Sequence, residues 1–309
     1  MKGQTLHGII RGVIPVAPTV FLENEELDLH GQRRIVDYLI DGESDAVCVL
    51  ANYSEQFSLD DVERGKVIDA TLDQTDGRIP VVVTTSHYSA RVAAIRSKDA
   101  QERGASMVML MPPFLGTSMR VDDAGVIEFF KRVADGLDID IMIQDSPLST
   151  TLLSVDVIAR IAEAVPQVRY AKIEMPRTAA KVRALHEAVS DNLPGVYDGE
   201  EAVTLIHDLD AGVKGTMSSC LVPDELGAIV RAYHSGSREK ATRQWEALLP
   251  LIHYENRQCG LAAAKLVLKE GGVIASDRVR APLSELSGPT RRELLDLARR
   301  FDILALRWS

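Results

Sequence analysis

The stretch VRYAKIEM, at residues 168–175, carries most of what the sequence says about the fold. It is short and largely apolar, and Pro176 ends it, which is the pattern of a buried strand. Side chains alternate along a strand, so Lys172 and Glu174 fall on the same face. A lysine and a carboxylate are costly to place in a buried strand. Such a pair indicates an amine that attacks carbonyl groups, with an acid or base within its reach.

Seven other apolar runs are spread along the chain, with amphipathic stretches between them. Most of these runs are rich in Val, Ile and Met and apolar on both faces, as parallel strands covered by helices are. They occupy residues 13–20, 46–50, 79–85, 107–111, 139–143, 195–198 and 212–217. Eight strand–helix units in succession predict an α/β fold, a (β/α)8 TIM barrel, with a doubly wound sheet as the alternative.

Local signals mark the ends of several expected helices. Ser58 with Asp61 is similar to a capping box in which Asp replaces Glu, and Ser154 is expected to begin another helix. Gly104 is expected to end a third. From residue 237 the pattern is purely helical, over residues 245–254, 261–269 and 290–301. We therefore expect a catalytic barrel at residues 1–236 and a C-terminal helical extension at residues 237–309.

The composition limits the classes of partner. The chain has 309 residues, a formal net charge of −10 and 46% hydrophobic residues, which is typical of a soluble globular protein. Its acidic balance argues against nucleic acid or an anionic membrane as partner. Three cysteines, widely spaced, indicate a reduced, cytoplasmic protein. We expect neither a secretion signal nor a membrane span, because the sequence has no apolar run of the necessary length.

Polar residues follow several of the expected strands, and barrel enzymes carry their reactive groups at the C-terminal ends of strands. We take the following as candidates for binding a small polar anion such as a keto acid: Asn52, Tyr53, Ser54, His87, Gln144, Met217 and Ser218. Each has an ordinary alternative. Residues 52–54 can form a strand-to-helix turn, His87 can cap the helix that begins near Ser89, Gln144 can bond to the backbone, and Ser218 can simply begin a helix.

The Lys–Glu pair has a specific chemistry to offer. A lysine at the barrel mouth loses hydration, which lowers its pKa and raises the fraction of neutral amine. The amine of Lys172 can then condense with a 2-keto group, and the iminium acidifies C3. Glu174 can serve as the acid, the base or both, or it can be a salt-bridge partner that only orients the lysine. His207, Asp208 and Asp210 have the wrong spacing for a zinc helix motif, so no metal is expected.

The chain resembles the dihydrodipicolinate synthase/N-acetylneuraminate lyase family over nearly its whole length. The resemblance begins at GVIPVAPT, residues 12–19, and reaches VRAPL, residues 279–283. The family's Schiff-base lysine corresponds to Lys172, and the segment of its strand-five tyrosine corresponds to QDSP, residues 144–147. The resemblance implies a Schiff-base barrel enzyme that takes a 2-keto acid, uses no metal or organic cofactor, and forms a homotetramer built as a dimer of dimers.

Three departures from the family pattern narrow the expected activity. The strand-five tyrosine is replaced by Gln144, and the Gly-Thr-Thr-Gly-Glu loop is replaced by ANYSE at residues 51–55. Phe114 stands where a neighbouring subunit usually donates a tyrosine. The usual hydroxyl relay is therefore missing, which leaves Glu174 as the best acid/base candidate.

This combination is most similar to the family branch that dehydrates 2-keto-3-deoxy sugar acids. The expected reaction converts 2-keto-3-deoxy-L-arabonate to 2-oxoglutarate semialdehyde and water. The alternatives are retro-aldol cleavage of such an acid to pyruvate and an aldehyde, deamination of a cyclic imino acid, and a non-catalytic keto-acid sensor. The intact Lys172 argues against the sensor.

Overall fold

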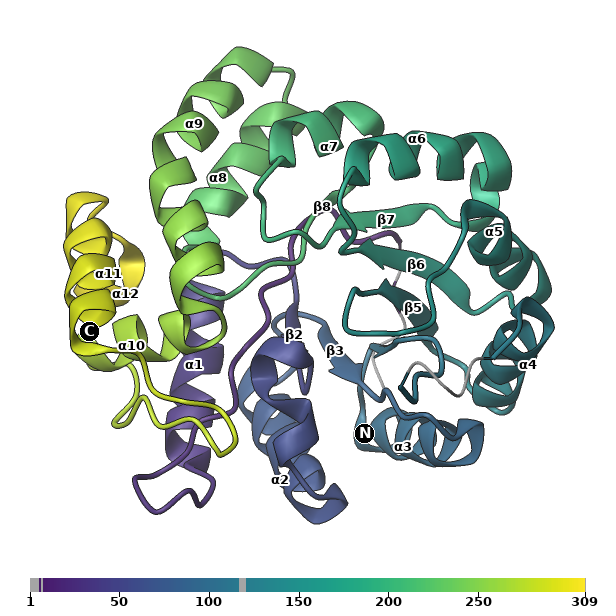
Figure 1. Cartoon of the computed structure of the whole chain (residues 1–309), viewed down its shortest axis with the longest axis horizontal. Helices are drawn as coiled ribbons and strands as arrows, with labels where there is room; N and C mark the ends of the chain where they lie inside the picture. Colours follow the sequence, from purple (N-terminus) through teal and green to yellow (C-terminus); the bar gives the residue numbers. More distant parts are fainter. Residues whose placement is uncertain (1–5, 7, 117–120, 309) are drawn as a thin grey trace. The chain divides into compact units, whose positions relative to one another are not determined.

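The computed structural model describes residue 6 and residues 8–116 and 121–308 (Figure 1). The strands in this range are β1 (Gly12–Val13), β2 (Val47–Val49), β3 (Val81–Thr84), β4 (Met107–Leu110), β5 (Asp140–Asp145), β6 (Val168–Ile173), β7 (Gly195–Asp198) and β8 (Gly215–Thr216). The helices that alternate with them are α1 (Leu29–Asp41), α2 (Asp61–Thr75), α3 (Ala90–Arg103), α4 (Asp123–Ala134), α5 (Val155–Ala164), α6 (Thr178–Val189), α7 (Leu205–Ala211) and α8 (Pro223–His234). Helices α9 (Arg238–Tyr254), α10 (Ala262–Glu270), α11 (Gly288–Arg300) and α12 (Leu304–Arg307) follow. This order is that of a (β/α)8 barrel with a helical C-terminal extension, as predicted.

The chain divides into two compact units that interleave in the sequence. The first comprises Met1–Arg11, Pro80–Glu200 and Thr204–Met217, and the second comprises Gly12–Ile79, Glu201–Val203 and Ser218–Ser309. The predicted boundary after residue 236 separates the barrel from the C-terminal helices and does not coincide with either unit, so it stays a prediction.

The first unit contains six neighbouring strands in chain order, from β3 to β8. The strands from β3 to β7 are parallel and almost wholly buried, because helices cover them. Strand β5 runs two residues further than expected. Gln144 and Asp145 pair with Lys172 and Ile173 of β6, so these two polar residues belong to the strand and do not follow it.

In the second unit the first strand is shorter than expected. The run at residues 13–20 forms strand structure only at Gly12–Val13, with an isolated parallel bridge between Val16 and Cys48. Pro15 and Pro18 explain the short strand, since proline has no N–H to donate to a ladder. Pro15 still accepts a hydrogen bond, from the backbone N–H of Cys48 at 2.9 Å.

The predicted helix ends are confirmed at two places and wrong at one. The hydroxyl of Ser154 accepts the N–H of Val157 at 3.2 Å and caps α5. Gly104 ends α3 with a positive φ of 118°, a conformation that glycine adopts without a steric penalty. Helix α2, however, does not begin at Ser58. Asp60 caps it and Glu63 completes the capping box, because this pair offers the longer carboxylate that reaches back to the cap.

No helix among the described residues has both the length and the apolar character needed to cross a membrane.

Candidate active site

Three polar side chains meet at the carboxyl ends of β5 and β6 in the first unit. The Nζ atom of Lys172 lies 2.8 Å from Oε1 of Glu174, and the two side chains are 5% and 12% exposed. Gln144 donates its Nε2 hydrogen to the same Glu174 oxygen at 2.7 Å. The register of β5 and β6 brings them together, because Gln144 is the direct partner of Lys172. An amine, a carboxylate and an amide therefore share one small, poorly hydrated volume.

Gly199, which follows β7, leaves room for the pair. A Cβ atom at this position would lie 2.6 Å from Cγ of Glu174 and 2.7 Å from Cγ of Lys172. The backbone N–H of Gly199 donates to the carbonyl of Ile173 at 2.9 Å, which holds the glycine against β6. Only a residue without a side chain fits so close to both groups. Gly199 was not among the predicted site residues, although a glycine directly after a buried strand was a usable signal.

The amide of Gln144 has one end committed and one end available. The residue is fully buried, and its Oε1 atom has no hydrogen-bond partner within the described part of the chain. The Nε2 end faces Glu174 because a carboxylate oxygen can only accept. A buried acceptor without a donor costs about 1–3 kcal/mol. A hydroxyl group of a bound molecule would satisfy it.

Asp145 and Lys181 lie behind these groups and were not singled out from the sequence. Nζ of Lys181, on α6, is 2.6 Å from Oδ2 of Asp145 and also 2.6 Å from the carbonyl oxygen of Leu153. The backbone carbonyl of Asp145 accepts the N–H of Glu174 at 3.0 Å. Burial raises the pKa of Asp145, and the hydrogen bond and charge of Lys181 act in the opposite direction.

Asp198 organises the neighbouring strand end. Its carboxylate is fully buried and accepts the N–H of Glu200 at 2.9 Å and the hydroxyl of Thr216 at 2.7 Å, which joins β7 to β8. The carbonyl of Asp198 accepts the N–H of Met217 at 2.8 Å. Met217 itself is fully buried, and its predicted role in substrate binding stays a prediction.

His87 has a structural contact that fits its alternative role. Its Nδ1 atom accepts the backbone N–H of Ser89 at 3.0 Å, directly before α3 begins at Ala90. This bond supports the helix-start alternative. A contact between His87 and substrate stays a prediction.

The remaining candidates lie in the second unit. Asn52, Tyr53 and Ser54 form the short helix η1 (Asn52–Ser54), and the Ser54 hydroxyl donates to the carbonyl of Ala17 at 2.6 Å. Ser218 accepts the backbone N–H of Val16 at 2.8 Å through its carbonyl oxygen. Residues 52–54 thus form a turn with defined contacts, and a role of this turn in carboxylate binding stays a prediction.

Glu55, directly after η1, belongs to a buried ion pair that the sequence did not reveal. Its carboxylate contacts Nζ of Lys265 on α10, and neither side chain is exposed. The second oxygen of Glu55 accepts the backbone N–H of Arg280 at 2.9 Å. Glu55 has a positive φ of 56°, which is costly for a residue with a side chain and is held here by these contacts.

Comparison with known proteins decides the family. Residues 9–300 match the model of the Dihydrodipicolinate synthetase family. This chain belongs to that family. It is 49% identical to an L-2-keto-3-deoxyarabonate dehydratase of Azospirillum brasilense over 299 residues, which is 97% of each chain. It is 28% identical to a 4-hydroxy-tetrahydrodipicolinate synthase of Nitrosococcus oceani, with 90% of this chain and 94% of that protein covered.

Solved structures of the Dihydrodipicolinate synthetase family share the fold. The structure of dihydrodipicolinate synthase from Aquifex aeolicus matches with a TM-score of 0.88 and 24% identity, covering 95% of this chain and 98% of that one. The enzyme from Thermotoga maritima matches with a TM-score of 0.86 and 25% identity, over 95% and 99% of the two chains. The predicted fold class is confirmed. Membership in the family, with a dehydratase among the relatives, makes the chain an enzyme of the lyase class.

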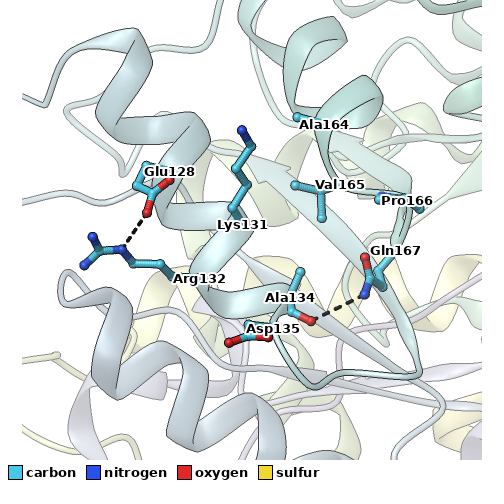
Figure 2. A pocket seen from close by; sticks show the side chains of 9 residues that line it. All are labelled: Glu128, Lys131, Arg132, Ala134, Asp135, Ala164, Val165, Pro166 and Gln167. Atoms are coloured by element: carbon cyan, nitrogen blue, oxygen red, sulfur yellow. Dashed lines mark hydrogen bonds and ion pairs between the residues drawn. The ribbon is translucent and has the colours of Figure 1, made fainter.

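A hollow of about 340 Å³ lies at the other end of the same strands (Figure 2). It is lined by the last turns of α4 and by residues 164–167, which precede β6. Figure 2 shows Arg132 paired with Glu128 and Gln167 bonded to the carbonyl of Ala134. Enzymes with this barrel react at the carboxyl ends of the strands, so the hollow is not a candidate for the chemistry of this family member.

No group of three or more His, Cys, Asp or Glu side chains that could hold a metal ion occurs in the described ranges.

Proposed function

We propose that this chain dehydrates a 2-keto-3-deoxy sugar acid through a Schiff base on Lys172. The proposed substrate is 2-keto-3-deoxy-L-arabonate, and the proposed products are 2-oxoglutarate semialdehyde and water. The observation that carries the proposal is the contact of Lys172 and Gln144 with one oxygen of Glu174. The dehydratase relative at 49% identity supports the choice of substrate.

The first step joins the substrate to the enzyme. The neutral amine of Lys172 adds to the C2 carbonyl, and water leaves to give a protonated imine. The positive nitrogen withdraws electrons and acidifies the hydrogens on C3. Glu174 contacts the Lys172 nitrogen at 2.8 Å, and C3 is two bonds from that nitrogen in the imine, so the carboxylate is the described acid/base group beside the carbon that must lose a proton.

In the dehydration step the carboxyl group of Glu174 carries out both proton transfers. Glu174 takes the C3 proton, and the electron pair forms an enamine. The protonated Glu174 then delivers that proton to the C4 hydroxyl, which leaves as water and produces a double bond between C3 and C4. Migration of this double bond toward the terminal carbinol carbon gives an enol that becomes the aldehyde. Hydrolysis of the imine restores Lys172, so the net change is the loss of one water.

Gln144 takes the position at which the resemblance implies a tyrosine, and it has a different function in this scheme. Its Nε2 hydrogen holds the Glu174 carboxylate in place. Its unpaired Oε1 is proposed to accept a substrate hydroxyl, which orients the sugar chain. The predicted absence of a metal or organic cofactor, the 2-keto acid partner and the homotetramer belong to the same proposal.

Reductive trapping tests the proposal. The enzyme is incubated with pyruvate and borohydride, and the labelled residue is identified by peptide mass spectrometry. We expect an adduct on Lys172, none in Lys172→Ala, and an unchanged adduct in Lys131→Ala, which removes an exposed lysine of α4. Incubation with 2-keto-3-deoxy-L-arabonate is expected to release semialdehyde. Release of pyruvate would instead support retro-aldol cleavage, and an adduct on another amine would refute the Schiff base on Lys172.

A further inference from the structure

Two buried tyrosines are the neighbours of Lys172 in the sheet. Tyr170 is two residues before Lys172 on β6, so alternation along the strand places both side chains on one face. Tyr197 of β7 is the direct register partner of Lys172, which puts its side chain on that face as well. Both tyrosines are fully buried, and the centroids of their rings are 6.5 Å apart. The amine that is proposed to react therefore has one aromatic neighbour along β6 and another across on β7.

The sequence GVYDG, at residues 195–199, fits this arrangement. Its two glycines and its tyrosine alternate along β7, so all three lie on the face that carries Lys172. A Cβ atom on Gly195 would lie 2.2 Å from Cδ1 of Tyr170. A Cβ atom on Gly199 would lie 2.7 Å from Cγ of Lys172. Each of these large side chains of β6 thus packs against a glycine of β7, which leaves it little room to shift.

The hydroxyl groups of both tyrosines hold the N-terminal segment, which we define as residues 8–10. The Tyr170 hydroxyl accepts the backbone N–H of Ile10 at 3.1 Å and donates to the carbonyl of Gly8 at 3.4 Å. The Tyr197 hydroxyl donates to the carbonyl of Ile10 at 2.7 Å. Both backbone groups of Ile10 are therefore bound by side chains that are 160 and 187 residues away in the sequence. The segment belongs to the same compact unit as β6 and β7.

We propose that Tyr170 and Tyr197 are positioning residues, which hold the Lys172 amine in the orientation that imine formation requires. In this proposal the N-terminal segment fixes the two tyrosines by binding their hydroxyl groups. The inference rests on the proposed function, because it assigns Lys172 the role of nucleophile. It goes beyond that function, because it connects the reacting amine to a backbone segment far from it in the sequence.

The connection works through close packing. A protein interior has few voids, so a ring that is fixed at its oxygen confines the side chains beside it. Addition of an amine to a carbonyl is sensitive to such confinement, because a displacement of about 1 Å can cost on the order of a hundredfold in rate. Loss of the hydroxyl hydrogen bonds keeps the rings but releases their oxygen ends. We therefore expect slower imine formation in a protein that is still folded.

The test compares Tyr170→Phe, Tyr197→Phe and the double variant, which remove hydroxyl oxygens and keep the rings. Imine formation is measured in single turnovers by borohydride trapping over a range of pyruvate concentrations. We expect the saturating rate to fall on the order of threefold to tenfold in each single variant and further in the double variant. The half-saturating pyruvate concentration is expected to stay the same, because the tyrosines act through the amine. Tyr233→Phe, on α8, is the control and should leave the rate unchanged.

Hydrogen exchange measures release of the N-terminal segment separately. The amide of Ile10 should exchange faster in Y170F than in the wild type, because its acceptor is gone. Unchanged exchange at Ile10 in Y170F would refute the role of the segment.

The outcomes separate the inference from the proposed function. A wild-type enzyme that forms no adduct with pyruvate on Lys172 would refute the proposed function. A wild type that is trapped on Lys172, together with folded variants that keep its saturating rate, would refute the inference and leave the function standing. A change confined to the half-saturating concentration would refute the inference as well. Circular dichroism identifies variants that do not fold. If the double variant is one of them, each single variant, which lacks one oxygen atom, gives the same decision.

Discussion

Exchange of Glu174 for glutamine tests the acid/base assignment most directly. The amide has nearly the same shape as the carboxylate. Its oxygen can therefore still accept the Gln144 hydrogen bond, which is 2.7 Å long in the wild type. The variant loses the negative charge and the ability to carry a proton between C3 and C4. General acid–base assistance is worth ~10² to 10⁴ in rate, so kcat should fall by that factor. In activation free energy this is about 3–5 kcal/mol.

Imine formation by Lys172 is expected to continue in the Glu174→Gln variant. The neutral nitrogen of Lys172 attacks the carbonyl, and that step does not require a carboxylate. E174Q should therefore still be labelled by pyruvate and borohydride while semialdehyde formation nearly stops. Single-turnover trapping and a steady-state semialdehyde assay measure the two steps separately. Glu163→Gln, at an exposed position of α5, is the matched control. An E174Q enzyme that keeps more than about a tenth of wild-type kcat would refute the reasoning.

Three further exchanges test single contacts. Gly199→Ala places a Cβ 2.6 Å from Cγ of Glu174 and is expected to cost about 1–3 kcal/mol in urea unfolding and to weaken imine trapping; normal trapping would contradict the close approach. Lys265→Met leaves Glu55 buried without its cation, so unfolding free energy should fall by about 3–5 kcal/mol, and by less when Glu55→Gln is added. Burial raises the pKa of Glu255 to about 7, above its unfolded value of 4.5, so the fold binds this proton more tightly. Its contribution to stability is therefore lost as pH rises from about 4.5 through about 7. Glu255→Gln should gain stability relative to wild type over that window, by up to about 3 kcal/mol, and equal slopes in the two proteins would contradict it.

The sequence predicted the fold and the central pair because both depend on short-range patterns. Residues that alternate along β6 put Lys172 and Glu174 on one side, and the structure brings them into contact. Each of the eight apolar runs overlaps a strand, and the pattern was readable because the strand residues are almost all buried. The ends of the strands were harder to predict. Gln144 looked like a residue beyond a strand because it is polar, yet its backbone is part of the ladder with β6.

The missed residues are those whose partners are distant in the chain. Lys265 and Glu55 are 210 residues apart, and neither position has a local pattern that indicates the other. Lys181 of α6 and Asp145 of β5 are 36 residues apart and likewise meet only in the folded chain. Such pairs depend on which elements become neighbours, so a periodic pattern within one element carries no trace of them. Gly199 could be predicted in part. Its place after a strand was readable in the sequence, but the side chains that it approaches were not.

The sharing of one Glu174 oxygen suggests how the first step prepares the second. In the free enzyme Oε1 accepts from both the Lys172 nitrogen and the Gln144 amide. An ammonium group has three N–H donors, whereas the protonated imine keeps one and is planar. In the proposed reaction, condensation with the substrate therefore leaves the Lys172 nitrogen with a single N–H donor. Gln144 is unchanged by that reaction, so its amide still orients the Glu174 carboxylate when a base is needed at C3. A tyrosine hydroxyl at this place could itself transfer a proton, whereas the Gln144 amide donates a hydrogen bond but does not titrate.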